Sequence, residues 1–337
     1  MSSSDLAALR RVVTRGVLLV ALILGVNVFV LSYYALMPQA RHSYDAMYHK
    51  VDMLDTIPAP RIIVIGGSSV AFGQNSKVME ELCGIPVINL GTHAGIGLHF
   101  MMQQAREKIR TGDIVLLAPE YAQFNGTFDG WHPLLDHVIE NPEAMQYIRS
   151  WGQLEAILEA VPLKFKDPLD KRLRNFVAPG DIPAKEQTGW TINRVDTISD
   201  APGYHGDTWS RERVRRSHPL RDWDPITGAY MDQQAITHVQ EFRDACASMG
   251  VRVLIEYPPV PEKYFEQSRR WIDSLHSVLT AALPGAVLRH PRESTYPEYM
   301  FLDTVYHLNA VGREVRSRQL AAALAQFVPA SHPPISK

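Results

Sequence analysis

Short runs of aliphatic and β-branched residues alternate with segments of helical composition, and this alternation limits the possible folds more than any other feature of the chain. The apolar runs cover residues 61–65, 86–90, 113–118, 251–257 and 286–289. The helical segments cover residues 77–82, 98–110, 232–248, 261–283 and 309–327. Nearly continuous apolar runs are typical of parallel strands that are buried on both faces. The sequence therefore predicts an α/β domain over residues 61–330, with a parallel sheet between two layers of helices.

Residues 122–230 interrupt this alternation, and we expect them to form an insertion in the domain. They contain helical pieces, several prolines and two basic stretches. The stretch 163–176 fits either a membrane-surface segment or an ordinary amphipathic surface segment. The stretch 211–221 contains five arginines, which fit either the binding of an anionic polymer or headgroup, or a loop paired with its own acidic neighbours.

An uncharged apolar run over residues 17–37 predicts a membrane anchor. At about 1.5 Å per residue, a helix of this length spans a hydrocarbon core of about 30 Å. Three arginines precede the run, which predicts a cytoplasmic tail over residues 1–16 and an outward-facing remainder that starts with a stalk over 38–60. A cleaved signal peptide is the alternative, but the run exceeds the usual ~7–15 apolar residues. We expect a single-pass protein of the cytoplasmic membrane with a periplasmic or extracellular domain.

Charge and cysteine content exclude several classes of protein. The 34 Lys and Arg residues nearly balance the 36 Asp and Glu residues, so the chain lacks the basic field that non-specific nucleic-acid binding needs. The two cysteines, Cys83 and Cys246, are too few for a disulfide framework or a cysteine-rich zinc site. Their positions favour buried thiols and leave a single bridge open.

The first predicted strand runs into the segment GGSSVAFG, residues 66–73. Glycines permit a tight turn there, and a serine that opens the following helix has backbone N–H groups around it that can hold an oxyanion. The segment therefore favours a nucleophilic serine. A loop that only caps or packs the helix is the alternative.

Asp303 and His307 precede the last predicted helix, for which Asn309 is the expected N-cap. A nucleophilic serine needs a base, and histidine titrates close to neutral pH. A neighbouring carboxylate fixes the histidine tautomer and stabilises the imidazolium. Serine, aspartate and histidine are thus present in an order that suits acyl-transfer chemistry.

These blocks resemble the SGNH/GDSL hydrolase superfamily, which carries a Gly-Asp-Ser motif after the first strand and an Asp-x-x-His motif near the C-terminus. The resemblance implies an SGNH-like, flavodoxin-like three-layer sandwich. It makes Ser69 the nucleophile, with Asp303 and His307 as its partners, and places Ser68 at the family's aspartate position and as the alternative nucleophile. The segment NLGTHAG, residues 89–95, matches the second block, so that Gly95 or Gly91 would supply an oxyanion N–H.

Two departures from the family pattern concern the same site. Asp303 and His307 are separated by one residue more than in the family. The third block reads APEY, residues 118–121, so the family's oxyanion-binding asparagine is absent. An ionised Glu120 cannot donate a hydrogen bond. Tyr121, another side chain or backbone N–H groups alone would then have to stabilise the oxyanion.

The anchor, the Gly-Ser-Ser serine and the altered third block are similar to a membrane-anchored acyltransferase branch, which includes the D-alanyl-lipoteichoic-acid transfer protein and alginate O-acetylation proteins. This resemblance implies a membrane-bound O-acyltransferase as partner and a cell-envelope or secreted polysaccharide as acceptor. An esterase of glycan or lipid and a non-catalytic polymer-binding or assembly subunit are the alternatives. No metal or cofactor is expected, because the histidines form no metal-binding motif and the glycine loops match no nucleotide motif.

Overall fold

A four-stranded parallel sheet forms the centre of the computed structural model, which describes residues 45–163, 204–207, 220 and 224–328 and positions 10, 12–18, 21, 22, 25 and 28. The strands lie in the order β2-β1-β3-β4. Their bounds are β1 (Ile62–Gly66), β2 (Val87–Asn89), β3 (Ile114–Ala118) and β4 (Arg252–Ile255). This arrangement confirms the predicted α/β fold with a parallel sheet.

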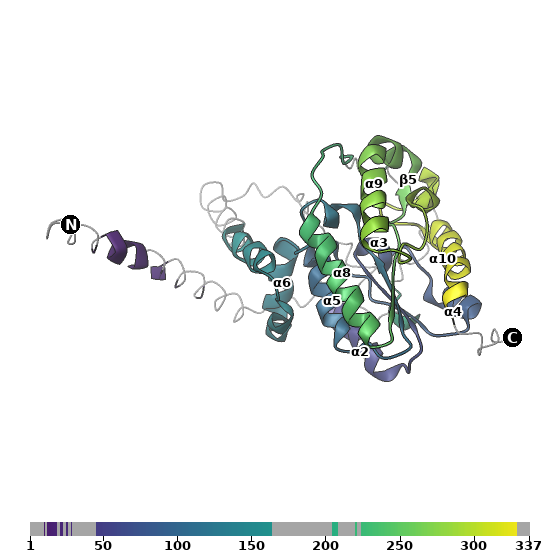
Figure 1. Ribbon diagram of the computed structural model, residues 1–337, viewed down its shortest axis with the longest axis horizontal. Helices are drawn as coiled ribbons and strands as arrows, with labels where there is room; N and C mark the ends of the chain where they lie inside the picture. Colours follow the sequence, from purple (N-terminus) through teal and green to yellow (C-terminus); the bar gives the residue numbers. More distant parts are fainter. Residues whose placement is uncertain are drawn as a thin grey trace, which may run out of the picture.

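Side chains that alternate along each strand enter two hydrophobic cores, one on each face of the sheet. In β1, Ile63 and Ile65 belong to the first core, whereas Ile62 and Val64 belong to the second. The first core is covered by α2 (Asp45–Thr56), α5 (Leu98–Arg106), α8 (Gln233–Ser248) and α9 (Glu262–Ala282). The second is covered by α4 (Ser76–Cys83) and α10 (Ala310–Leu324), which lie together on the other side of the sheet in Figure 1. Helix, sheet and helix thus form three layers.

The predicted strand over residues 286–289 is reduced to a single parallel bridge between Val287 and Ile255. Leu288 still donates its N–H to the Ile255 carbonyl, at 2.8 Å. The next residue, Arg289, turns its side chain to Glu256, and the chain continues into η5 (Pro291–Ser294). Pairing therefore stops after one bridge.

The described parts of the insertion pack into the domain. Leu134 in α6 (His132–Glu140) and Ile157 in the helix over residues 151–163 belong to the first core. Asp207, which follows η4 (Tyr204–Gly206), is buried and accepts hydrogen bonds from the N–H and hydroxyl of Ser76, at 2.8 and 2.7 Å. Residues 164–203, 208–219 and 221–223 lie outside the described residues, and with them most of both basic stretches.

The described part of the predicted stalk belongs to the domain. Leu54 of α2 is fully buried in the first core, and Arg61 donates hydrogen bonds to the Leu54 and Ile57 carbonyls. Arg61 also forms a buried ion pair with Asp113, at 3.1 Å, next to the start of β3. The helix before the sheet is therefore held to β1 and β3 by one buried arginine.

The predicted membrane anchor falls mostly on residues outside those that the structure describes. Among the described positions, no helix has the length and apolar character needed to cross a bilayer.

Both cysteines, Cys83 and Cys246, are buried free thiols, so they form no bridge with each other. Burial raises the pKa of each thiol to about 11. The thiols are therefore packing groups of the cores, as expected for cysteine in this environment.

Candidate active site

Residues 66–73, the serine loop, follow β1 at the edge of the sheet where the parallel strands end. Open α/β sheets bind ligands at this edge. Two glycines allow the loop to approach its neighbours closely. A Cβ on Gly66 would lie 2.4 Å from the Ala118 carbonyl oxygen, and one on Gly67 would lie 2.7 Å from Oε1 of Glu120. Only glycine fits at these positions, and the close approach brings α3 (Ser68–Ala71) next to Glu120.

The two serines of the loop have different surroundings. Ser68 is partly exposed, and its hydroxyl donates to Oε1 of Glu120 at 2.9 Å. Ser69 is completely buried, and its hydroxyl has no hydrogen-bond partner in the described part of the chain. The geometry therefore does not support the prediction that Ser69 is the nucleophile. Ser68, the alternative in the sequence, is the serine that a substrate can reach.

Asp303 and His307 lie within hydrogen-bond distance, with 2.8 Å between Oδ1 of the aspartate and Nδ1 of the histidine. The loop that holds them is closed by a 2.8 Å hydrogen bond from the Leu302 N–H to the His307 carbonyl. The extra residue between the two side chains is thus accommodated. Burial of the Asp303 carboxyl acts to raise its pKa, but the hydrogen bond and charge of His307 outweigh this effect, so the pKa is lowered.

The His307 ring packs against Phe72, the C-cap residue of α3. Its centroid is 4.5 Å from that of Phe72, and the Phe72 N–H donates to the Ser68 carbonyl, one helical turn earlier. The charge of His307 also acts on Glu120, the residue that accepts the Ser68 hydroxyl. Ser68, Glu120 and the Asp303–His307 pair therefore gather at one site.

Glu120 is buried at the centre of this site, with 5% of its surface exposed. Its Oε1 accepts the Ser68 hydroxyl and the Ser69 N–H, at 2.9 and 3.0 Å. The Glu120 N–H donates to Oε1 of Gln123 at 3.0 Å, which fixes the backbone at the start of η2 (Tyr121–Phe124). Burial raises the pKa of Glu120 above its ordinary value, despite the hydrogen bonds and the charge of His307.

Gly91 and Gly95, which were expected to donate an N–H to the oxyanion, each donate that N–H to a neighbouring side chain instead. The Gly91 N–H donates to Oδ1 of Asn89 at 2.8 Å, and the Gly95 N–H donates to Nδ1 of His93 at 3.0 Å. The predicted donor role of Gly91 and Gly95 is therefore not supported. Gly91 has a steric role instead, because a Cβ there would lie 2.2 Å from the Ala71 nitrogen.

Tyr121 belongs to the first core. Its ring stacks with Tyr257 at 6.2 Å and meets Trp271 edge-on at 6.2 Å. Its hydroxyl is buried and has no hydrogen-bond partner among the described residues. These contacts do not support the prediction that Tyr121 donates to an oxyanion.

His93 is a feature of the site that the sequence motifs did not reveal. Since Nδ1 accepts the Gly95 N–H, the proton of the neutral ring is on Nε2. Burial and the neighbouring His132 and His307 lower the pKa of His93 to about 4, so the ring is neutral at pH 7. Within the described residues, no group of three or more histidines, cysteines or acids could hold a metal ion.

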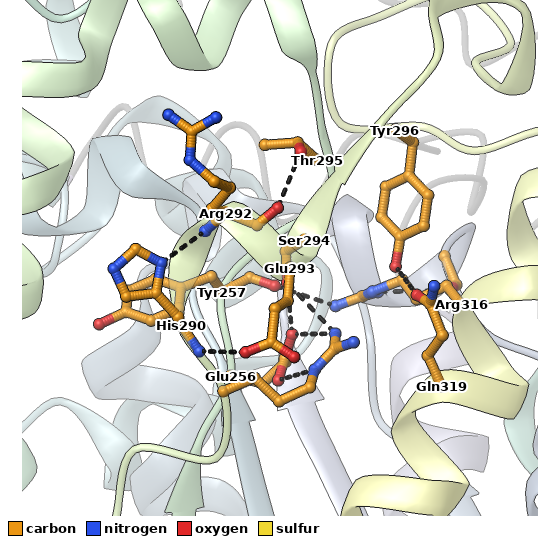
Figure 2. Close-up of polar contacts among 12 residues, drawn as sticks. Glu256, Tyr257, His290, Arg292, Glu293, Ser294, Thr295, Tyr296, Arg316 and Gln319 are labelled. Atoms are coloured by element: carbon orange, nitrogen blue, oxygen red, sulfur yellow. Dashed lines mark hydrogen bonds and ion pairs between the residues drawn. The ribbon is translucent and has the colours of Figure 1, made fainter.

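Arg316 of α10 donates hydrogen bonds to backbone carbonyls of the serine loop. It is buried and donates from Nη1 to the Ser69 and Gly73 carbonyls, at 3.4 and 3.3 Å. Its Nη2 donates to the Tyr257 carbonyl at 3.3 Å, and Figure 2 shows the guanidinium next to this residue. The arginine thus joins α3 to the end of β4.

Glu256 forms a separate polar cluster beside Arg316, shown in Figure 2. Its carboxylate is fully buried and accepts hydrogen bonds from Nε of Arg289 at 3.1 Å and the Ser294 hydroxyl at 2.6 Å. Glu256 therefore pairs with Arg289 at the edge of the core.

Comparison of the sequence with protein-family models and with curated proteins gives no match.

Proposed function

We propose that the chain is a serine-dependent acyl-transfer enzyme in which Ser68 carries the acyl group. One observation supports this most strongly: Glu120 accepts the hydrogen bond from the hydroxyl of the partly exposed Ser68 and is acted on by the charge of His307, which is hydrogen-bonded to Asp303. A serine, a histidine and an orienting carboxylate are the groups that covalent acyl transfer requires.

In the first step, His307 takes the Ser68 proton on Nε2 while Oγ attacks the carbonyl carbon of the acyl donor. The bond between that carbon and the donor's oxygen breaks, and the leaving oxygen takes the proton from His307. Asp303 holds Nδ1, at 2.8 Å, and so leaves Nε2 for this exchange. The Ser68 hydroxyl, which donates to Glu120 in this structure, must turn to His307 for the step to begin.

In the second step, an acceptor hydroxyl gives its proton to His307 and attacks the acyl group on Ser68. The product ester forms, and the proton returns to Ser68. The family resemblance supports hydroxyls of a cell-envelope or secreted polysaccharide as acceptor and acetyl or a similar acyl group as cargo. It also supports an SGNH-like fold, a membrane anchor over residues 17–37 and a membrane-bound O-acyltransferase as the donor of the acyl group.

An esterase is the second candidate. The Asp303 side chain is 60% exposed, so solvent reaches the rim of the site. Water could then replace the acceptor hydroxyl in the second step with no change in the groups that act.

The experiment uses the full chain in detergent and a fluorophosphonate probe, which reacts with activated serines. We expect labelling of the unsubstituted protein and of Ser69→Ala, and its loss in Ser68→Ala and His307→Ala. Thermal melting of each variant shows that the fold is retained. Labelling of Ser68→Ala at the original rate would contradict the proposal, because another serine would then be the nucleophile. Absence of labelling in the folded, unsubstituted protein would favour the non-catalytic alternative.

Turnover of p-nitrophenyl acetate, with and without an added polysaccharide acceptor, separates the two enzyme classes. Transfer to the polysaccharide that exceeds release of acetate supports the acyltransferase. Release of acetate at the same rate in the presence of acceptor supports the esterase.

A further inference from the structure

Glu120 places a carboxyl group where the site should stabilise negative charge. Oε1 accepts hydrogen bonds from the Ser68 hydroxyl, the proposed nucleophile, and from the neighbouring Ser69 N–H. In the family that the sequence resembles, an asparagine from this segment donates to the oxyanion. An ionised glutamate in its place would repel the negative charge that develops on the carbonyl oxygen. The site must therefore avoid this repulsion.

The surroundings of Glu120 supply hydrogen bonds from Ser68 and Ser69 and the charge of the nearby His307, but burial outweighs their effect on its pKa. In the part of the chain that the structure describes, no lysine or arginine forms an ion pair with it, and 5% of its surface is exposed. The titratable groups that act on it or feel its charge are His307, Tyr264 of α9 and Tyr306. Both tyrosines are neutral at pH 7, because burial raises the pKa of each hydroxyl. A buried carboxylate without a cationic partner is costly, which favours the protonated form.

The two carboxyl oxygens of Glu120 have different hydrogen-bonding roles. Because Oε1 accepts two hydrogen bonds, the proton of a neutral carboxyl group belongs on Oε2. A neutral carboxyl group then resembles the carboxamide of asparagine: Oε1 accepts hydrogen bonds and the protonated Oε2 donates one. This is the donor that the altered third block, APEY, otherwise lacks.

We infer that Glu120 works as a neutral carboxylic acid whose Oε2–H donates a hydrogen bond to the carbonyl oxygen of the acyl group on Ser68. As Ser68 attacks, the carbonyl oxygen becomes negative and the hydrogen bond from Oε2 strengthens. The proton remains on Glu120 and the hydrogen bond weakens again when the carbonyl re-forms, so no net proton transfer is needed. This inference rests on the proposed function of Ser68.

The competing role is that of an ionised base that takes the Ser68 proton. Glu120→Gln separates the two, because an amide keeps the acceptor and the donor but cannot take a proton. We expect Glu120→Gln to keep the fluorophosphonate labelling rate within about tenfold, whereas Glu120→Ala should lose about 10²–10³-fold, as for removal of one oxyanion donor. A rate for Glu120→Gln as low as that of Glu120→Ala would overturn the inference.

The pH dependence gives a second readout. Ionisation of Glu120 as the pH rises removes the Oε2 donor, so labelling of the unsubstituted protein should decline over the range in which Glu120 ionises. In Glu120→Gln this decline should be absent. An identical decline with rising pH in both proteins would overturn the inference.

Infrared difference spectroscopy tests the protonation state without any activity. The spectrum of the unsubstituted protein minus that of Glu120→Gln, at pH 7, should contain the carbonyl stretch of a protonated carboxylic acid. Glu256→Gln is the matched control, since Glu256 is also buried but pairs with Arg289. Its difference spectrum should show loss of an ionised carboxylate instead. A carboxylate signal for Glu120 as well would overturn the inference.

The two proposals fail in different ways. If the unsubstituted protein is not labelled at all, the proposed function fails, and the infrared spectrum still reports on Glu120. If Ser68 is labelled but Glu120→Gln behaves as Glu120→Ala, the role of Glu120 fails and the function of Ser68 stands.

Discussion

Nδ1 of His307 lies 2.8 Å from Oδ1 of Asp303, although the histidine side chain is 4% exposed and the aspartate side chain 60% exposed. Because the aspartate faces solvent, we expect the contact to contribute little to the free energy of folding and to act mainly by orienting the imidazole.

Asp303→Asn should therefore change activity far more than stability. We expect the fluorophosphonate labelling rate to fall about 10²-fold or more, because the amide no longer stabilises the imidazolium. The free energy of unfolding should stay within about 0.5 kcal/mol of the original value. Labelling kinetics and urea unfolding measure the two quantities, and an unchanged labelling rate would argue against His307 as the base.

Ser69→Ala tests the assignment of the two serines. The Ser69 hydroxyl is buried and makes no hydrogen bond within the described residues, so its removal relieves an unsatisfied polar group. We expect stability to stay the same or rise by up to about 1 kcal/mol, with labelling unchanged. Loss of labelling in a folded Ser69→Ala protein would restore Ser69 as the nucleophile.

Arg316→Met tests the support of the serine loop. The carbonyls of Ser69, Gly73 and Tyr257 would lose their shared donor, which should cost about 2–4 kcal/mol and slow labelling. Arg318→Met on the same helix is the control, because Arg318 is 61% exposed and pairs with Glu314. Chemical unfolding that gives the same stability for both variants would show that Arg316 has no supporting role.

Acid should destabilise the protein through His137, which is buried in α6 beside Phe100. Burial lowers its pKa from 6.5 to about 4. The unfolded chain therefore binds a proton below pH 6.5 that the folded protein does not, and stability falls as the pH drops from about 6.5 to about 4. The loss for this one group is about 3 kcal/mol, from about 1.4 kcal/mol per pKa unit.

His137→Phe keeps a buried ring and removes the titration. Urea unfolding at several pH values between 7.5 and 4.5 should show a shallower loss of stability for this variant. Parallel curves for the variant and the unsubstituted protein would mean that His137 is not the group responsible.

Local sequence patterns predicted the sheet and the contact between Asp303 and His307. The apolar runs identified β1 to β4 because each strand is buried on both faces, and a run of that kind has few alternatives. The spacing of Asp303 and His307 predicted their contact, since a short loop before a helix keeps them close.

The choice between Ser68 and Ser69 depended on contacts that are distant in the sequence. Gly66 and Gly67 permit the loop to turn at either position, and the approach of Glu120, 52 residues after Ser68, decides which serine is buried. The direction of the Tyr121 ring was likewise decided by Tyr257 and Trp271.

The hydrogen bonds that Gly91 and Gly95 donate have a signal in the local sequence. Asn89 precedes Gly91 by two residues and His93 precedes Gly95 by two, and each side chain accepts the glycine N–H. Asparagine often accepts the N–H two residues later in a turn, so at least the Gly91 N–H could have been recognised as occupied.

The most direct test of the central claim is to find the residue that carries the acyl group. The full chain is mixed with p-nitrophenyl acetate, quenched in acid and digested, and the acetylated peptide is sequenced by tandem mass spectrometry. The account predicts acetyl on Ser68, absent from Ser68→Ala and strongly reduced in His307→Ala. Acetyl on Ser69, or acetate release without any acetylated serine, would contradict it.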